Sequence, residues 1–292
     1  MKLQGSFVAL VTPFKDGRLN EGKLRELVRF HLDNGTDGLV PCGTTGESPA
    51  LSDAERRRIF EIVLEEAKGK ATIVAGTGTN STEKTIKATR EAQELGADAA
   101  LVITPYYNKP TQEGLYRHFE AVVRAANLPI MIYNVPGRTS VNILPQTVAR
   151  LAELDNIVAI KEASGDLNQV SQIIGLCGEK IKVFSGDDSL FTPILAVGGV
   201  GVVSVVANLV PKDLRALFES FQAGDLQKTR EWHHRLFPLC QAMFYETNPG
   251  PVKTAMNLLG FEVGELRLPL APMSQENKAR LTQALQAYGL LK

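Results

Sequence analysis

Residues 156–166 read NIVAIKEASGD, an apolar run that ends in a lysine and then in a turn. The run Ile157–Ile160 is short and continuous, which is typical of a strand that is buried on both faces. Lys161 follows directly, and a lysine is costly to hold out of water unless something uses it or pairs with it. The stretch therefore predicts a parallel strand that carries one charged side chain at its carboxyl end.

Seven further segments of the same kind occur along the chain: SFVALVTP, GLVPCGTTGE, TIVAGTG, AALVITPYY, PIMIYNVPGRT, KVFSGDD and GVVSVVAN. The segments between them, such as 20–35 and 81–96, begin at Asn or Ser and end at Gly, as capped amphipathic helices do. Eight strands that alternate with helices imply a parallel sheet closed on itself. We predict an α/β fold, a (β/α)8 TIM barrel over residues 1–224, followed by a C-terminal helical domain of three helices over residues 225–292.

The composition favours a small-molecule partner. Thirty-two basic and 32 acidic residues among 292 leave no net charge, so no field recruits nucleic acid or an anionic membrane. The apolar run near the start is shorter than a signal-peptide core, and the longest apolar stretch, 194–207, is too short to span a membrane. Three widely spaced cysteines form neither a disulfide framework nor a zinc motif. We expect a cytoplasmic protein.

The lysines divide between the two ends of the predicted barrel. Active sites of such barrels lie at the C-terminal ends of the strands, where Lys161 stands, whereas Lys182 begins the next strand at the opposite end. A desolvated lysine can attack a carbonyl group and form a Schiff base. The alternative is a structural lysine that pairs with a neighbour such as Glu162. Lys161 is thus the one lysine of this chain that the sequence marks as a candidate catalytic group.

Polar groups at other strand ends favour the catalytic reading. Tyr133 has a hydroxyl that can pass protons, and the loop after it carries Arg138, whose planar cation suits a carboxylate. Thr44 and Thr45 lie in the Gly-bounded turn GTTGES, which can hold a second carboxylate. Each residue alone has an ordinary structural explanation, but their convergence on one face does not. The combination predicts an imine formed with a 2-oxo acid and a tyrosine that moves the proton, without a cofactor.

Other chemistries fit the sequence less well. The four histidines fall in predicted helices, so we expect no metal site. A phosphate-binding barrel has Gly-rich loops after its last two strands, but these strands end in GDD and ANLVP, and Asp187 and Asp188 would repel phosphate. The two aspartates are expected to begin a helix. The stretch GTGTNST lacks the third glycine of a dinucleotide fingerprint.

The strings GTTGES, TPYYNKPTQEGLYRHF, YNVPGRT, IKEASGD and SGDD, in this order, resemble the dihydrodipicolinate synthase family nearly end to end. The general GTTGE and IKEASGD pattern marks a wider group of pyruvate-dependent Schiff-base enzymes, which includes N-acetylneuraminate lyase and 2-keto-3-deoxy sugar acid aldolases. The sialic acid lyases resemble the chain less at the Arg138 loop. The resemblance implies condensation of pyruvate with L-aspartate 4-semialdehyde to give 4-hydroxy-tetrahydrodipicolinate in lysine and diaminopimelate biosynthesis. Another pyruvate-dependent aldolase or lyase of this group, or a barrel that only binds a ligand, stays open as an alternative.

The resemblance also implies roles for individual residues. Lys161 matches the Schiff-base lysine, and Tyr133 matches the proton donor and acceptor. Thr44 and Tyr107 match the partners of Tyr133 in a proton relay. The family is commonly a homotetramer built from dimers, so Tyr107 is expected to come from a neighbouring subunit. The matched substrate-binding positions are Thr45 for the pyruvate carboxylate, Arg138 for the semialdehyde carboxylate, and Gly186 and Val203, which line the pyruvate site through the backbone.

Some members of this family bind lysine as an inhibitor in a cleft between subunits, and the resemblance places part of that cleft here. Ser48, Asn80 and Tyr106 match it. Asp53 and Arg56 stand where lysine-sensitive members tend to have histidine, and Lys84 occupies the position of an acidic ligand, with Glu83 beside it. A cation that faces a cationic effector is unfavourable. We expect a degraded cleft, with weak inhibition or none unless Glu83 takes the place of Lys84.

Overall fold

Eight parallel strands close into a barrel in the computed structural model, which describes residues 2–292. The strands are β1 (Gly5–Ala9), β4 (Gly38–Val40), β5 (Thr72–Gly76), β6 (Ala99–Ile103), β7 (Ile130–Asn134), β8 (Ile157–Glu162), β9 (Lys182–Ser185) and β10 (Gly201–Ser204). Each pairs with its neighbour in the sequence, and β10 pairs with β1 to close the ring. The predicted (β/α)8 fold is confirmed.

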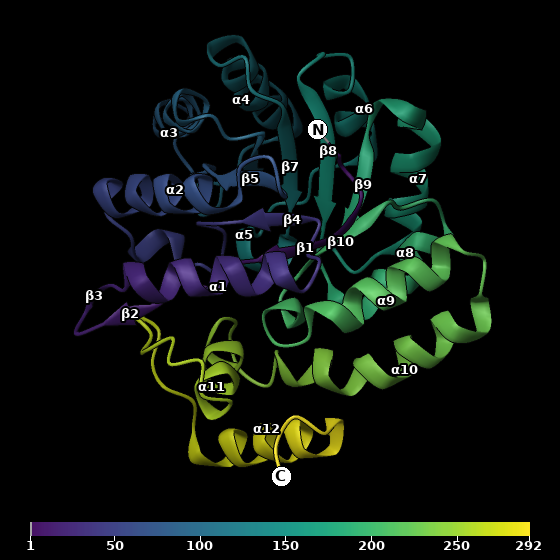
Figure 1. Ribbon diagram of the computed structural model, residues 1–292. Coiled ribbons are helices and arrows are strands. Elements are labelled where there is room, and N and C mark those ends of the chain that lie inside the picture. Colours follow the sequence, from purple (N-terminus) through teal and green to yellow (C-terminus); the bar gives the residue numbers. More distant parts are fainter. Residues whose placement is uncertain (1) are drawn as a thin grey trace.

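A helix follows each strand and covers the outside of the barrel (Figure 1). These helices are α1 (Glu21–Asp33), α2 (Asp53–Ala67), α3 (Thr82–Leu95), α4 (Gln112–Ala125), α6 (Pro145–Leu151), α7 (Leu167–Cys177), α8 (Phe191–Ala196) and α9 (Pro211–Gln222). Their ends use the expected chemistry: Ser52 and Glu55 form a capping box on α2, and Gly96 ends α3 in the left-handed conformation. The caps set where each helix leaves the barrel wall.

Several short elements were not predicted. A hairpin of two-residue strands, β2 (Phe14–Lys15) and β3 (Arg18–Leu19), precedes α1. Residues 2–292 also contain the 3-10 turns η1 (Ser48–Ala50), η2 (Gly178–Lys180), η3 (Asp188–Leu190) and η4 (Val206–Asn208), of which η3 begins at the two aspartates that were expected to begin a helix. Arg138 was expected in a loop, but it lies on a single helical turn, α5 (Pro136–Thr139). These pieces are too short for a periodic sequence pattern to reveal them.

The three predicted C-terminal helices are α10 (Leu226–Ala242), α11 (Gly250–Leu258) and α12 (Gln275–Tyr288). Helix α10 packs against α9 and α12, and α11 packs against α12 and η4. In Figure 1 the arrowheads of β7 and β8 point toward the half of the molecule that contains α11 and α12. The C-terminal helices therefore lie toward the carboxyl ends of the strands. The domain boundary between residues 224 and 225 stays a prediction.

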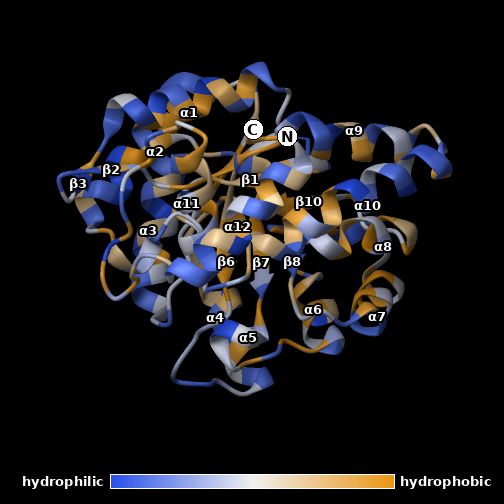
Figure 2. Cartoon of the chain, turned by 90° about the horizontal axis from the view of Figure 1, so that it is seen from below, coloured by the Kyte–Doolittle hydropathy of each residue, from blue (hydrophilic) through white to orange (hydrophobic). Residues whose placement is uncertain are grey.

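The pleat of β8 separates its side chains into two groups. Ala159 belongs to the cluster that fills the barrel interior, and Ile160 belongs to the cluster between the strands and the helices. Since successive side chains of a strand point to opposite faces, Lys161 faces the interior with Ala159, and Glu162 faces the helices with Ile160. Figure 2 shows the hydrophobic strands surrounded by helices.

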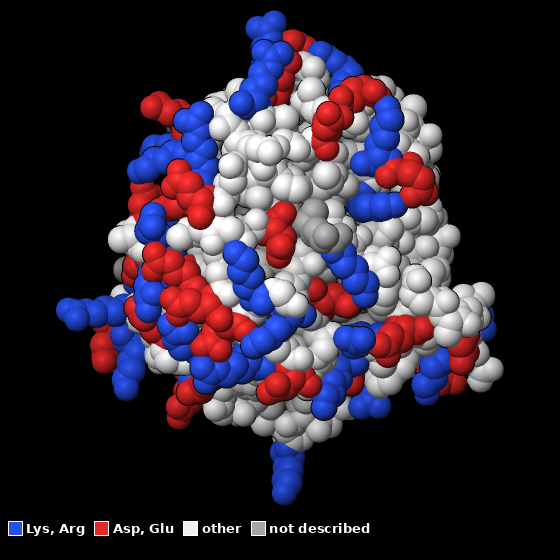
Figure 3. Space-filling view, turned by 45° about the horizontal axis from the view of Figure 1, so that its top comes forward, with Lys and Arg blue, Asp and Glu red and all other residues white. Residues whose placement is uncertain are grey.

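Charge on the surface is mixed in sign. Figure 3 shows basic and acidic side chains interspersed over one face, in keeping with the equal numbers of the two kinds. Within residues 2–292, no helix combines the length and the apolar character that a bilayer crossing requires.

Candidate active site

Lys161 is a buried lysine without a counter-ion. Its side chain is on the interior face of β8 and the residue is 5% exposed. Glu162 does not pair with it, because that carboxylate accepts hydrogen bonds from Asn134, Gln169 and the Ser164 N–H on the other face of the strand. Within residues 2–292 the Lys161 amine forms no ion pair. The structural alternative, a Lys161–Glu162 pair, is therefore wrong.

Tyr133 is the closest aromatic neighbour of this amine. Tyr133 pairs with Lys161 in the register of β7 and β8, so both side chains point into the barrel at the same height. The Lys161 Nζ lies 4.3 Å from the centre of the Tyr133 ring. The amine therefore lies beside the tyrosine ring and not beside a carboxylate.

Gly186 leaves room for the lysine. A Cβ on Gly186 would lie 3.0 Å from Lys161 Cε and 2.7 Å from the Ala163 Cβ. The Gly186 N–H donates to the Glu162 carbonyl at 2.7 Å, which holds the end of β9 against β8. Val203 on β10 is fully buried in the barrel interior and pairs with Phe7 of β1. The predicted positions Gly186 and Val203 thus lie at adjacent strand ends.

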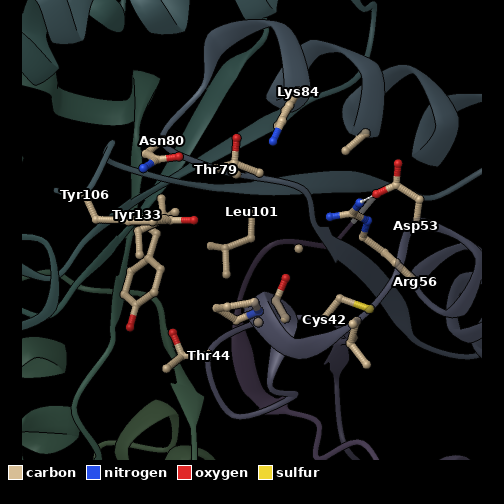
Figure 4. Close-up of a pocket in the computed structure, with 18 of the residues that line it drawn as sticks. Cys42, Thr44, Asp53, Arg56, Thr79, Asn80, Lys84, Leu101, Tyr106 and Tyr133 are labelled. Atoms are coloured by element: carbon tan, nitrogen blue, oxygen red, sulfur yellow. Dashed lines mark hydrogen bonds and ion pairs between the residues drawn. The ribbon is translucent and has the colours of Figure 1, made fainter. Parts of the chain in front are cut away.

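A cavity of about 580 Å³ opens beside Tyr133. Its wall includes Thr44 and Arg138, whereas Lys161, Thr45, Gly186 and Val203 are not part of this wall. Figure 4 shows the Tyr133 hydroxyl directed toward the side of the cavity where Thr44 lies. The two hydroxyls that the sequence joins in a relay therefore share one cavity.

Thr45 and Arg138 are connected through one residue. Asn248 Nδ2 donates to Thr45 Oγ1 at 3.0 Å, and Arg138 Nη2 donates to the Asn248 carbonyl at 3.2 Å. Thr45 is buried, whereas Arg138 is exposed at the rim. The sequence did not mark Asn248, because the segment NPGPVK that contains it has no catalytic pattern.

Tyr107 points away from its own site. It is 89% exposed, and its φ of 72° is in the left-handed region that a bulky residue rarely adopts. It is also absent from the wall of the cavity that contains Tyr133. The structure thus places Tyr133 beside Lys161 and in one cavity with Thr44, but it does not bring Tyr107 to this group.

The residues predicted for an effector cleft lie on the wall of the same cavity. Ser48, Asn80 and Tyr106 line it. Lys84 also lines it, whereas Glu83 is not among the lining residues, which favours Lys84 over Glu83 as the residue that faces the cavity. Figure 4 shows Lys84, Asp53 and Arg56 on the side of the cavity away from Thr44.

Both acidic side chains on the cavity wall, those of Asp53 and Glu91, are paired with cations. Asp53 binds both Arg56 and Lys87, the latter at 2.9 Å, and Lys87 is the main cause that lowers the pKa of Asp53. Glu91, on the same wall, pairs with Arg57 at 3.2 Å. Lys84 has no ion-pair partner within residues 2–292. A cation thus stands unopposed in the cleft.

Buried titratable groups outside this site have structural roles. Asp187 caps η3, and Asp188 accepts hydrogen bonds from the Val205 and Val206 N–H groups, while burial raises the pKa of Asp188. Burial lowers the pKa of His118 to about 4 and that of His31 to about 3. In the described part of the chain no three His, Cys, Asp or Glu residues gather as a metal site would require.

A buried ion pair that the sequence did not reveal supports the turn that contains Thr44 and Thr45. Lys253 Nζ of α11 lies 2.8 Å from Glu47 Oε1, and both side chains are almost fully buried. Burial lowers the pKa of Lys253, an effect that the charge of Glu47 opposes. Glu47 also accepts from the Arg267 N–H and has a φ of 55°. The pair ties the GTTGES turn to the C-terminal helices.

A (β/α)8 barrel that presents an unpaired interior lysine beside a tyrosine has the features of the enzymes that form Schiff bases with carbonyl substrates. The Dihydrodipicolinate synthetase family matches residues 2–288. The chain belongs to this family, so the family and the enzyme class predicted from the sequence are confirmed.

Individual relatives cover the whole chain. The 4-hydroxy-tetrahydrodipicolinate synthase of Geotalea uraniireducens is 56% identical over 288 residues, 99% of each chain. The dihydrodipicolinate synthase structure from Aquifex aeolicus is 47% identical, with a TM-score of 0.97 over 99% of both chains. The structure from Acinetobacter baumannii, a chloride-inhibited dihydrodipicolinate synthase complexed with pyruvate, is 42% identical, with a TM-score of 0.97 over 99% of this chain and 100% of that one.

Proposed function

We propose that this chain is a 4-hydroxy-tetrahydrodipicolinate synthase that condenses pyruvate with L-aspartate 4-semialdehyde, a step of lysine and diaminopimelate biosynthesis, through a Schiff base on Lys161. The full-length relatives support the overall reaction. The observation that carries the role of Lys161 is its buried amine, which has no carboxylate partner among residues 2–292 and lies beside Tyr133. No cofactor enters the proposed chemistry.

The chemistry starts with the neutral amine of Lys161. It attacks the keto carbon of pyruvate, and loss of water gives the imine. The imine withdraws electrons from the neighbouring methyl carbon, which then loses a proton and becomes a nucleophilic enamine. The enamine attacks the aldehyde carbon of the semialdehyde, and the aldehyde oxygen takes up a proton. The amino group of the semialdehyde then attacks the re-formed imine carbon, which closes the ring and releases the Lys161 amine. Tyr133 is proposed to move these protons because its side chain lies next to Lys161.

The two substrate carboxylates have separate binding groups in this proposal. Thr45, buried in the GTTGES turn, holds the pyruvate carboxylate near Lys161, and the backbones of Gly186 and Val203 line the same side. Arg138, at the exposed rim, receives the carboxylate of the semialdehyde. A buried hydroxyl for the first substrate and an exposed cation at the rim for the second suit an ordered reaction in which pyruvate enters first.

A second copy of the chain is proposed to complete the proton relay. Thr44 and Tyr133 share the cavity, whereas Tyr107 projects into solvent from its own subunit. In the proposed homotetramer, a dimer of dimers, the exposed Tyr107 of each subunit enters the active site of a neighbouring subunit. Light scattering at micromolar concentration tests the assembly. The cytoplasm is the proposed location, in keeping with three buried, free cysteines.

Lysine is proposed to inhibit this chain weakly or not at all. Asp53 is already bound by Arg56 and Lys87, so its carboxylate is not available to an incoming ammonium group. Lys84 repels such a group from the same wall of the cavity. Ser48, Asn80 and Tyr106 would supply only neutral contacts.

Trapping with borohydride tests the function directly. With pyruvate present, reduction should add mass to the peptide that contains Lys161, and the protein should turn over pyruvate and the semialdehyde in a coupled assay. Lys161→Ala should abolish both signals. Lys182→Ala is the matched control, because Lys182 begins β9 at the opposite end of the barrel and pairs with Glu179. Labelling at another lysine would refute the assignment.

A further inference from the structure

We propose that Asn248 is a positioning residue that orients the Thr45 hydroxyl toward the carboxylate of pyruvate. The inference rests on the proposed function, because it assumes that Thr45 receives that carboxylate. Asn248 lies in the segment before α11, 203 positions after Thr45 in the sequence, yet the two side chains are in contact in the buried interior.

The direction of this hydrogen bond determines what Thr45 can do. A hydroxyl has a single proton to donate and two lone pairs that accept. Asn248 Nδ2 donates to Thr45 Oγ1, so one lone pair of Oγ1 is occupied and the hydroxyl proton points elsewhere. Among residues 2–292 the Thr45 hydroxyl has no other hydrogen-bond partner. Its proton is therefore available to a carboxylate, which only accepts hydrogen bonds.

Burial does not give the Asn248 side chain a full set of hydrogen bonds. The residue is 4% exposed, and its Oδ1 has no hydrogen-bond partner among the described residues. A buried amide with an unpaired oxygen costs free energy, and such a group in a native structure calls for an explanation. Orientation of Thr45 by the other half of the amide provides that explanation.

The segment around Asn248 is anchored to the same turn at a second point. Lys253 Nζ, five residues later, donates to Glu47 and to the carbonyls of Thr12 and Glu265. All three protons of the ammonium group are thus used. Glu47 follows Thr45 by two residues, so the two contacts hold the turn and the segment in a fixed relation.

The two contacts of Asn248 use different atoms, which makes the proposal separable by mutation. The side chain reaches Thr45, whereas the backbone carbonyl receives Arg138. Asn248→Ala removes only the first contact. It should raise the KM for pyruvate about 5- to 10-fold, the scale of one hydrogen bond, and leave the KM for the semialdehyde unchanged. Asn248→Asp should raise the pyruvate KM further, because its carboxylate accepts the Thr45 proton and repels pyruvate.

Borohydride trapping with pyruvate alone gives an independent readout. The pyruvate concentration for half-maximal labelling of Lys161 should rise in Asn248→Ala by the same factor as the KM. In a Thr45→Val background, Asn248→Ala should have no further effect on this concentration. Asn257→Ala is the matched control, since Asn257 is on α11, the helix that follows Asn248, and its side chain bonds to Val263 and Gly264 instead of Thr45.

The outcomes separate this proposal from the one on which it rests. If wild-type protein were not labelled by pyruvate at Lys161, the proposed function would fail. If wild-type protein were labelled and Asn248→Ala kept the wild-type pyruvate dependence, or raised both KM values equally, the positioning role of Asn248 would be wrong. The same conclusion would follow if Asn257→Ala changed the pyruvate KM as much as Asn248→Ala.

Discussion

Gly186→Ala is the smallest change that should displace Lys161 without altering any catalytic group. The φ of Gly186 is outside the left-handed region, so alanine meets no backbone strain there. The new Cβ would lie 2.7 Å from the Ala163 Cβ and 3.0 Å from Lys161 Cε. Carbon atoms in normal contact are about 3.5 to 4.0 Å apart. Something must move by several tenths of an ångström.

Lys161 gives way at the 3.0 Å contact, because its Cε is near the end of a flexible side chain. The 2.7 Å contact with the Ala163 Cβ is relieved only by a shift of the backbone, which also moves the end of β9 against β8. Extra methyl groups in packed interiors cost about 1 to 3 kcal/mol. If about 2 kcal/mol of this cost falls on the position of the reactive amine, kcat/KM for pyruvate should drop about thirtyfold.

The assay is the initial rate against pyruvate concentration, together with the rate of borohydride labelling at Lys161. Gly175→Ala is the control, because a Cβ on Gly175 meets no heavy atom within 4 Å and alanine is the better helix residue inside α7. It should keep wild-type kinetics and gain roughly 0.5 to 1 kcal/mol of stability. Wild-type labelling and kcat/KM in folded Gly186→Ala would refute the claim that Gly186 makes space for Lys161.

Three further predictions follow from the site and the core. Tyr133→Phe should keep the fold and lower turnover about a hundredfold or more, the scale of a positioned acid or base; full activity in the coupled assay would remove Tyr133 from the mechanism. Lysine at submillimolar concentration should leave the initial rate at saturating substrates unchanged, and half-inhibition in that range would overturn the assignment of Lys84 as an opposing cation. His118 has a native pKa of about 4 against 6.5 in the unfolded chain, so its contribution to stability is complete above pH 6.5 and is lost as the pH falls to about 4. The free energy of unfolding falls by roughly 3 kcal/mol over this pH range as a result. The thermal midpoint of His118→Gln should therefore fall less than that of the wild type. Parallel plots of thermal midpoint against pH for the two proteins would contradict this prediction.

The features that the sequence predicted have local causes. Each barrel strand is a short apolar run, and the helices α1, α2 and α3 begin at Asn20, Ser52 and Ser81 with side-chain caps. Such runs and caps act within a few residues, so a sequence pattern can reveal them. The rule that chemistry lies at the carboxyl ends of strands then selected Lys161 and Tyr133, which the register of β7 and β8 places side by side.

The features that the sequence did not reveal depend on distant contacts or on very short elements. The strands β2 and β3 have two residues each, which is too few for an alternating pattern. Lys253 resembles any lysine on a helix until the fold buries it against Glu47, 206 positions earlier. The sequence left a Lys161–Glu162 pair open, because the actual partners of Glu162, Asn134 and Gln169, are distant in the chain and required the structure.

The structure of the barrel explains why strand-end residues could be predicted from the sequence and the contacts of the following turns could not. The strand ends present reactive groups in fixed directions, but the turns that follow them are held only at one side by the barrel. The GTTGES turn, with Glu47 at a positive φ, needs a second support, which α11 provides through Lys253. Helix α11 lies toward the carboxyl ends of the strands, so the short segment immediately before it reaches the site. Asn248 occupies that place, so the C-terminal helices contribute to the proposed chemistry by fixing Thr45 and receiving Arg138.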